Sequence, residues 1–147
     1  MIKIVTDSTA YLPEAIVRQH DIRVVPLYVH FGEEAFREGV ELSDKEFYAR
    51  LKEAPALPTT SQPSAGEFHQ IFEELAEAGH EIVTLTISSK LSGTWNSAMA
   101  ATEMLPEPRI MVSSETVGTM ATFAVFALGF GMLPNGTRLA QLTDELG

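Results

Sequence analysis

The alternation of short β-branched runs with segments of helical period is the feature of this sequence that most constrains its fold. The run Glu81–Ile87 is the strongest strand candidate, because its apolar residues are bounded by polar turns, as in buried parallel strands. Strands that alternate with helices are typical of βαβ units. The alternation therefore predicts an α/β fold with three layers, α/β/α, and a mainly parallel sheet. The expected strands are Ile2–Val5, Arg23–Phe31, Glu81–Ile87 and Arg109–Val112.

Start and stop signals locate the expected helices. Ser43 and Ser64 are each followed three residues later by a glutamate, the spacing of a capping box. Pro13 suits a first helical turn, and Gly79 is placed to end a helix. The expected helices run from Pro13 to near His20, from Ser43 to about Glu53, over Gly66–Ala78, from Trp95 to near Leu105, over Met120–Met132, and from Thr137 through Leu146.

Apolar spacing predicts which helical faces are buried. In the helix after Ser64 the spacing predicts a face that packs on the sheet, and the helix after Gly93 has a second such set. Pro26 inside the second strand indicates an edge position or a bulge, and the segment 32–39 is expected to form a turn-rich connection or a small hairpin. The two predicted faces consist of Phe68, Ile71, Phe72 and Leu75, and of Trp95, Ala98, Met99 and Thr102.

Charge and cysteine content narrow the classes of function. The net charge of −10 disfavours binding to nucleic acid or acidic membranes. The absence of cysteine excludes disulfides, thiolate zinc sites and cysteine nucleophiles, and it is compatible with a reducing cytosol. The longest apolar run, Met120–Leu133, is too short to span a bilayer, and the N-terminus does not resemble a signal peptide. We therefore expect a cytoplasmic protein of one domain, residues 1–147.

Hydroxyl-rich segments follow the expected strands at four places. In parallel α/β sheets, ligands bind beyond the carboxyl ends of the strands, where free N–H groups at helix N-termini favour anions. The expected ligand head group is therefore a small anion, a carboxylate or a phosphate, held by hydroxyls and backbone amides. The four segments are Thr6–Thr9, Thr59–Ser64, Ser88–Thr94 and Ser113–Thr119.

Each of these polar residues also has a structural explanation. Serine and threonine before a helix are most often helix caps, and Ser64 is best explained as a cap. Thr60 and Ser92 are less well explained in this way, because Ser64 and Thr94 are the better cap candidates for the helices that follow. For Asp7 the sequence leaves two roles open, a contact to a ligand or cation and an Asx turn.

The sequence offers little support for catalysis or metal binding. The four histidines do not have metal-ligand spacing, no phosphate-binding glycine fingerprint occurs, and no base is nominated for a nucleophilic serine. A non-catalytic binding protein without a metal or cofactor is therefore expected. Two alternatives remain, a phosphate- or nucleotide-binding enzyme and a fragmentary structural domain without a ligand.

Three motifs resemble those of the DegV family of bacterial fatty-acid-binding proteins. They are TDST with the following Leu12-Pro13, TSQPS at Thr60–Ser64, and ISSKLSGTWNSA at Ile87–Ala98, in the same order and spacing as in the family. The resemblance covers roughly the first 110 residues. The resemblance implies that this chain is the N-terminal one of two α/β domains. It also implies that the whole protein carries a single long-chain fatty acid. Some members of the family serve as the acyl-binding subunit of a fatty-acid kinase.

The resemblance also implies roles for particular residues. Thr60 and Ser92 match the hydroxyl residues that bind the carboxylate, and the backbone N–H of Gly93 lies beside Ser92. Asp7, Ser8 and Ser61 are supporting candidates. The bound fatty acid is the expected ligand.

The family's second domain has no counterpart in these 147 residues. In the family that domain contributes basic side chains to the head group and closes the site. We therefore expect exposed apolar surface on Met120–Met132 and on the site loops, which favours self-association.

Overall fold

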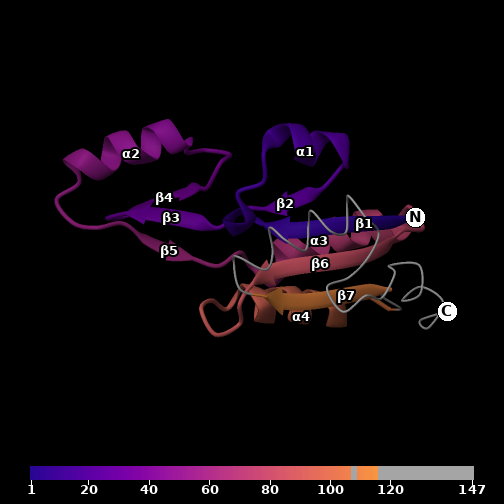
Figure 1. Cartoon of the computed structure of the whole chain (residues 1–147). Helices are drawn as coiled ribbons and strands as arrows, with labels where there is room; N and C mark the ends of the chain where they lie inside the picture. Colours follow the sequence, from indigo (N-terminus) through magenta and orange to yellow (C-terminus); the bar gives the residue numbers. More distant parts are fainter. Residues whose placement is uncertain (107–108, 116–147) are drawn as a thin grey trace.

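A computed structural model describes residues 1–106 and 109–115, which form two sheets with flanking helices (Figure 1). The larger sheet has four parallel strands in the order β2-β1-β6-β7, and the smaller has three antiparallel strands in the order β4-β3-β5. The predicted α/β class with a mainly parallel sheet is confirmed. The elements are β1 (Ile2–Asp7), a short 3-10 helix η1 (Ser8–Ala10), α1 (Glu14–Gln19), β2 (Arg23–Val25), β3 (Tyr28–Phe31), β4 (Glu34–Arg37), α2 (Asp44–Glu53), β5 (Thr59–Ser61), α3 (Ala65–Glu77), β6 (Glu81–Ile87), α4 (Thr94–Glu103) and β7 (Ile110–Glu115).

The main core lies between the parallel sheet and helices α3 and α4. Strand β6 has the predicted bounds and pairs with β1 on one side and β7 on the other. Helix α3 buries Phe68, Phe72 and Leu75, so its predicted apolar face is confirmed. Gly79 follows this helix with a φ of 75°, a left-handed conformation that ends helices and favours glycine.

The predicted buried face of α4 is confirmed at Ala98, whereas Trp95, Met99 and Thr102 are only partly buried. The buried residues are Thr94, Ala98 and Ala101. Small side chains at these positions allow α4 to pack closely against its neighbours, an arrangement that hydrophobic spacing alone does not reveal.

The strand order creates a switch point between β1 and β6. The chain leaves β1 through α1 toward β2, and it leaves β6 through α4 toward β7, which lies in the opposite direction. Because such crossovers are almost always right-handed, α1 and α4 belong to opposite faces of the sheet, as in a three-layer fold. In open parallel sheets, ligands bind beyond the carboxyl ends of the strands at this point.

The predicted strand Arg23–Phe31 is wrong as a single element. It is divided at Pro26 and Leu27 into β2, at the edge of the parallel sheet, and β3, in the centre of the smaller sheet. Pro26 lacks the N–H that an unbroken strand would need for its ladder. The predicted hairpin is confirmed as β3–β4, with Gly32 in a left-handed conformation at its turn.

Two segments expected to be loops after parallel strands belong to strands. Thr59–Ser61 is β5, which pairs antiparallel with β3, so it does not follow a parallel strand. Ser113 and Ser114 extend β7 and pair with Leu85 and Thr86. In both places, pairing with a strand that is distant in the sequence overrides the local preference for a turn.

Two helices expected in the C-terminal part of the chain cannot be compared with the structure. The helix expected over Met120–Met132 and the one expected after Thr137 lie outside the described residues. Within residues 1–106 and 109–115, no helix has both the length and the apolar character needed to cross a membrane.

Candidate functional site

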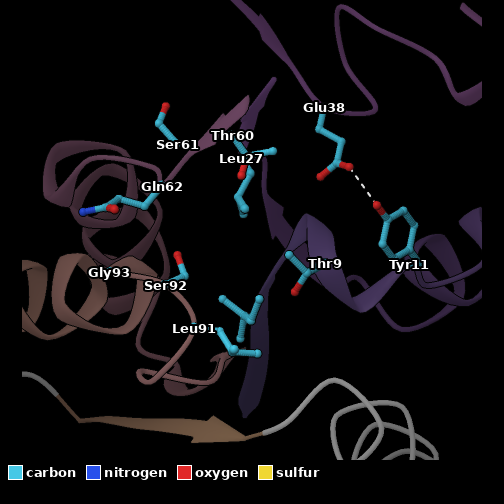
Figure 2. Close-up of a pocket in the computed structure, with 11 residues that line it drawn as sticks. Thr9, Tyr11, Leu27, Glu38, Thr60, Ser61, Gln62, Leu91, Ser92 and Gly93 are labelled. Carbon is cyan, nitrogen blue, oxygen red and sulfur yellow. Dashed lines mark hydrogen bonds between the residues drawn. The ribbon is translucent and has the colours of Figure 1, made fainter. Parts of the chain in front are cut away.

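A pocket of about 360 Å³ lies at the switch point, where β1 and β6 end and the smaller sheet meets the larger one (Figure 2). Residues from both sheets and from the start of α4 surround it, so distant parts of the chain form a single cavity. The lining residues are Thr9, Tyr11, Leu27, Glu38, Thr60, Ser61, Gln62, Ile87, Leu91, Ser92 and Gly93.

Helix α4 begins at this pocket without a side-chain cap. Gly93 occupies the N-cap position and makes no side-chain cap hydrogen bond, so the prediction of Thr94 as the cap is wrong. Thr94 is instead the first helical residue and is fully buried. An uncapped N-terminus leaves backbone N–H groups that can bind an anion, and the helix dipole adds to this preference.

Ser92 precedes this helix and makes two contacts with Thr94. Its Oγ accepts a hydrogen bond from the Thr94 backbone N–H at 3.3 Å and lies 2.9 Å from Thr94 Oγ1. A hydroxyl has one proton and two acceptor sites. With Thr94 Oγ1 as the second donor, Ser92 keeps its own proton for a ligand in the pocket.

Thr60 and Ser61 are neighbours on β5, and successive side chains of a strand point to opposite faces. The Ser61 hydroxyl lies 2.8 Å from His30 Nε2 on β3, and Figure 2 shows it pointing away from the other pocket side chains. The Thr60 hydroxyl makes no hydrogen bond to any other described residue. Thr60 is therefore better placed than Ser61 to donate to a ligand.

Gly93 is also the point at which Gln62 approaches α4. A Cβ atom at position 93 would lie 2.5 Å from Gln62 Nε2 and 2.8 Å from Gln62 Oε1. Such distances are shorter than non-bonded atoms tolerate, so a larger residue at position 93 would displace the Gln62 amide. Gln62 is exposed and its amide is the end of a flexible side chain, so a larger residue at position 93 would move this amide and not the backbone of TSQPS.

Asp7 joins the ends of β1 and β6. Its Oδ1 accepts hydrogen bonds from the Thr9 N–H at 2.9 Å and the Thr9 hydroxyl at 2.5 Å, and its Oδ2 accepts one from the Ile87 N–H at 2.7 Å. Burial raises the pKa of the Asp7 carboxyl, although the hydrogen bonds from Thr9 and Ile87 act in the opposite direction. Of the two roles left open by the sequence, these contacts favour the turn, since both oxygens already have protein partners.

Ser8 does not line the pocket but positions a residue that does. Its hydroxyl donates to Glu38 Oε2 at 2.5 Å and accepts from the Leu27 N–H at 3.0 Å. The Tyr11 hydroxyl donates to the other Glu38 oxygen at 2.9 Å. These contacts fix a carboxylate in the pocket wall.

Four of the six residues nominated from the sequence line this one pocket: Thr60, Ser61, Ser92 and Gly93. Asp7 and Ser8 contact residues of its wall. Sequence reasoning missed Gln62 and Leu91, although both lie inside the two quoted motifs, and it missed Glu38, for which no local pattern gave a signal. Within the described residues, no group of three or more potential ligand side chains could hold a metal ion.

The fold and the pocket define a parallel α/β domain with a hydroxyl-lined pocket at its switch point. The chain belongs to the DegV family, because the family model described as "Uncharacterised protein, DegV family" matches residues 1–146. A DegV domain-containing protein of Halalkalibacterium halodurans is 52% identical over 105 residues, which are 71% of this chain and 37% of that protein. The family resemblance seen in the motifs is thereby confirmed.

Solved structures of related proteins have a similar fold. A stearic acid-binding protein from Eubacterium ventriosum has a TM-score of 0.81 and 33% identity, with 99% of this chain and 52% of that chain covered. A fatty-acid-binding DegV family protein from Thermus thermophilus has a TM-score of 0.79 and 34% identity, with 99% and 51% covered. This chain spans about half the length of these two proteins.

Proposed function

We propose that this chain binds a long-chain fatty acid and that the pocket between β5 and the start of α4 holds the carboxylate. The observation that carries the proposal is the meeting of Thr60, Ser92 and the uncapped N-terminus of α4 in one cavity. The similar proteins from Eubacterium ventriosum and Thermus thermophilus are described as binding stearic acid and fatty acid, which supports this choice of ligand.

Hydroxyls and backbone amides suffice for this head group. Hydrogen bonds to a charged partner contribute about 1.5–3 kcal/mol each, so Thr60, Ser92 and the Gly93 N–H together can orient a carboxylate. Leu27, Ile87 and Leu91 line the same pocket and provide apolar contacts for the first methylenes. Burial of the tail at about 0.8 kcal/mol per methylene supplies most of the affinity.

The proposed role is that of a carrier and not of a catalyst. By this proposal the protein sequesters the acid in the cytoplasm and presents its carboxylate to a partner, for which a fatty-acid kinase catalytic subunit is the candidate. Self-association through apolar surface remains a further proposal. The support for a carrier is chemical, because the pocket offers donors for a carboxylate, and the only described pair of a serine with a histidine, Ser61 with His30, is exposed.

Native mass spectrometry of the protein purified from a bacterial host tests the proposal. We expect a co-purifying mass of a C16–C18 acid, which the double variant Thr60→Val/Ser92→Ala loses. Ser61→Ala is the matched control, because that hydroxyl is held by His30 and its removal should leave the lipid bound.

Two other results would support the alternatives. A protein without lipid that binds a nucleotide would favour the phosphate- or nucleotide-binding enzyme. A folded chain that binds neither lipid nor nucleotide would favour the structural domain without a ligand.

A further inference from the structure

The two sides of the pocket differ in charge. Thr60 and Ser92 present neutral hydroxyls on one side, whereas Figure 2 shows Glu38 and Tyr11 together on the other. No lysine or arginine is among the described residues that line the cavity. A fixed negative charge therefore faces the position where the proposed function places an anionic head group.

Glu38 is held firmly in this wall. Its two oxygens accept from Tyr11 at 2.9 Å and from Ser8 at 2.5 Å, and its backbone N–H donates to the Leu27 carbonyl at 2.9 Å. Leu27 in turn fixes Ser8 through its own N–H. A glutamate on an open surface rotates freely into solvent. The Glu38 carboxylate is instead held in one orientation by these hydrogen bonds.

Tyr11 remains a donor to Glu38 over the whole physiological range. Tyr11 is 69% exposed, and its hydroxyl donates to Glu38 at the pocket wall. Burial there, followed by the hydrogen bond to Glu38, raises the pKa of Tyr11 to about 12.

The Asp7 carboxyl lies near enough to be influenced by the charge of Glu38, so this end of the pocket is acidic below its surface as well.

We propose that Glu38 selects the charge of the head group, so that the pocket accepts a singly charged carboxylate and disfavours a doubly charged phosphate. Repulsion between Glu38 and a ligand increases in proportion to the ligand's charge, and a partly enclosed site screens it less than open solvent. This inference rests on the proposed function and adds a rule of selectivity to it. The class of ligand is thereby narrowed to acyl chains that end in a single negative charge.

Palmitate and hexadecyl phosphate each contain sixteen carbons, and their tails differ by one methylene. This difference cancels when the ratio of their affinities is compared between variants, so the pair tests the rule. At pH 8 and low ionic strength the phosphate carries about two charges, since its second pKa is about 6. Titrations of the 147-residue chain with both ligands, at concentrations where they are monomeric, should show tighter binding of palmitate. In Glu38→Gln we expect palmitate affinity to rise about threefold and hexadecyl phosphate affinity about tenfold, so that selectivity falls about threefold.

The control variant is Glu33→Gln, which makes the same change in net charge in the exposed β3–β4 turn, outside the pocket lining. It should leave the selectivity ratio unchanged. Glutamine retains one carbonyl acceptor, which can serve either Tyr11 or Ser8 but not both, because these hydroxyls donate to different oxygens of Glu38. Wild-type protein in 1 M salt therefore gives a second readout that does not change the hydrogen bonds, and screening should also reduce the ratio.

Three outcomes overturn the proposal. They are an unchanged ratio in Glu38→Gln, an equal loss of affinity for both ligands, and a ratio that does not respond to salt. Failure of the wild-type chain to bind palmitate would instead overturn the proposed function itself, so the two failures are distinguishable.

Discussion

Helices α3 and α4 both follow hydroxyl-rich segments, but their N-termini are built in opposite ways. At α3, Ser64 Oγ accepts from the Glu67 N–H at 3.3 Å, and Glu67 Oε2 accepts from the Ser64 N–H at 2.8 Å. This capping box satisfies the end of the helix and places a carboxylate there. At α4, Gly93 provides no side-chain cap, Ser92 Oγ accepts from one backbone N–H, that of Thr94, at 3.3 Å, and Gly93 lines the pocket.

This difference is the reason for proposing the anion site at α4 and not at α3. A closed N-terminus stabilises the helix, whereas an open one leaves its N–H groups and its dipole for a ligand. Abundant serine and threonine before a helix therefore do not distinguish the two cases. The decisive residues are the glutamate three positions after Ser64 and the glycine at position 93.

Placing a capping side chain at the N-terminus of α4 should have the largest effect on palmitate affinity. We expect Gly93→Asp to weaken palmitate binding about 100-fold, because an aspartate at position 93 would compete for the free N–H groups, repel the ligand carboxylate and displace the Gln62 amide. Calorimetric titration measures the loss. Gly66→Asp in the first turn of α3 is the matched control, and equal binding by wild type and Gly93→Asp would contradict this view of α4.

A smaller change at the same position tests the contact with Gln62. We expect Gly93→Ala to weaken binding about tenfold, because the new methyl group displaces the Gln62 amide by overpacking. In a Gln62→Ala background, Gly93→Ala should have little further effect in the same titration, because the amide that the methyl group displaces is already absent. A second tenfold loss in that background would show that the Gln62 contact is not the cause.

Removing the Ser64 cap from the N-terminus of α3 should lower the stability of the protein and leave palmitate affinity unchanged. We expect Ser64→Ala to lower the free energy of unfolding by about 1 kcal/mol, as loss of an N-cap usually does. Urea denaturation checks this value, and Ser43→Ala, which removes the capping box of α2, should cost a similar amount. A loss of palmitate affinity in Ser64→Ala at unchanged stability would show that the α3 end takes part in binding.

The smallest expected effect is on the pH dependence of stability. Burial acts to raise the pKa of Glu67, but hydrogen bonds from Ser64 and Tyr28 outweigh it, and the pKa is lowered from 4.5. The folded state thus gains stability from Glu67 above pH 4.5 and loses it as the pH falls through the lower folded value. Glu67→Gln should flatten the acid side of a stability profile measured by urea denaturation, and a profile as steep as that of wild type would contradict this.

Local physics made the capped regions predictable from the sequence. The two capping boxes, the apolar face of α3 and the bounds of β6 each depend on residues a few positions apart, and all four are observed. The β3–β4 hairpin, which turns at Gly32, also depends on residues that are close together in the sequence. The motifs also predicted which hydroxyls share a pocket with Gly93.

Features that depend on distant partners were not predictable in this way. β5 forms because β3 is available to pair with it, and the division at Pro26 reflects the need to supply strands to two sheets. Glu38 enters the pocket because Ser8 and Tyr11, which precede it by 30 and 27 residues, hold it there. No periodicity or short motif encodes such contacts.

A double-mutant cycle on palmitate binding tests whether Thr60 and Ser92 hold the same carboxylate. Calorimetry on wild type, Thr60→Val, Ser92→Ala and the double variant gives the coupling free energy. We predict that each single variant loses about 1.5–3 kcal/mol and that the two losses are not additive, because both hydroxyls donate to one group. Single variants that bind palmitate as tightly as wild type, or losses that add independently, would contradict the account.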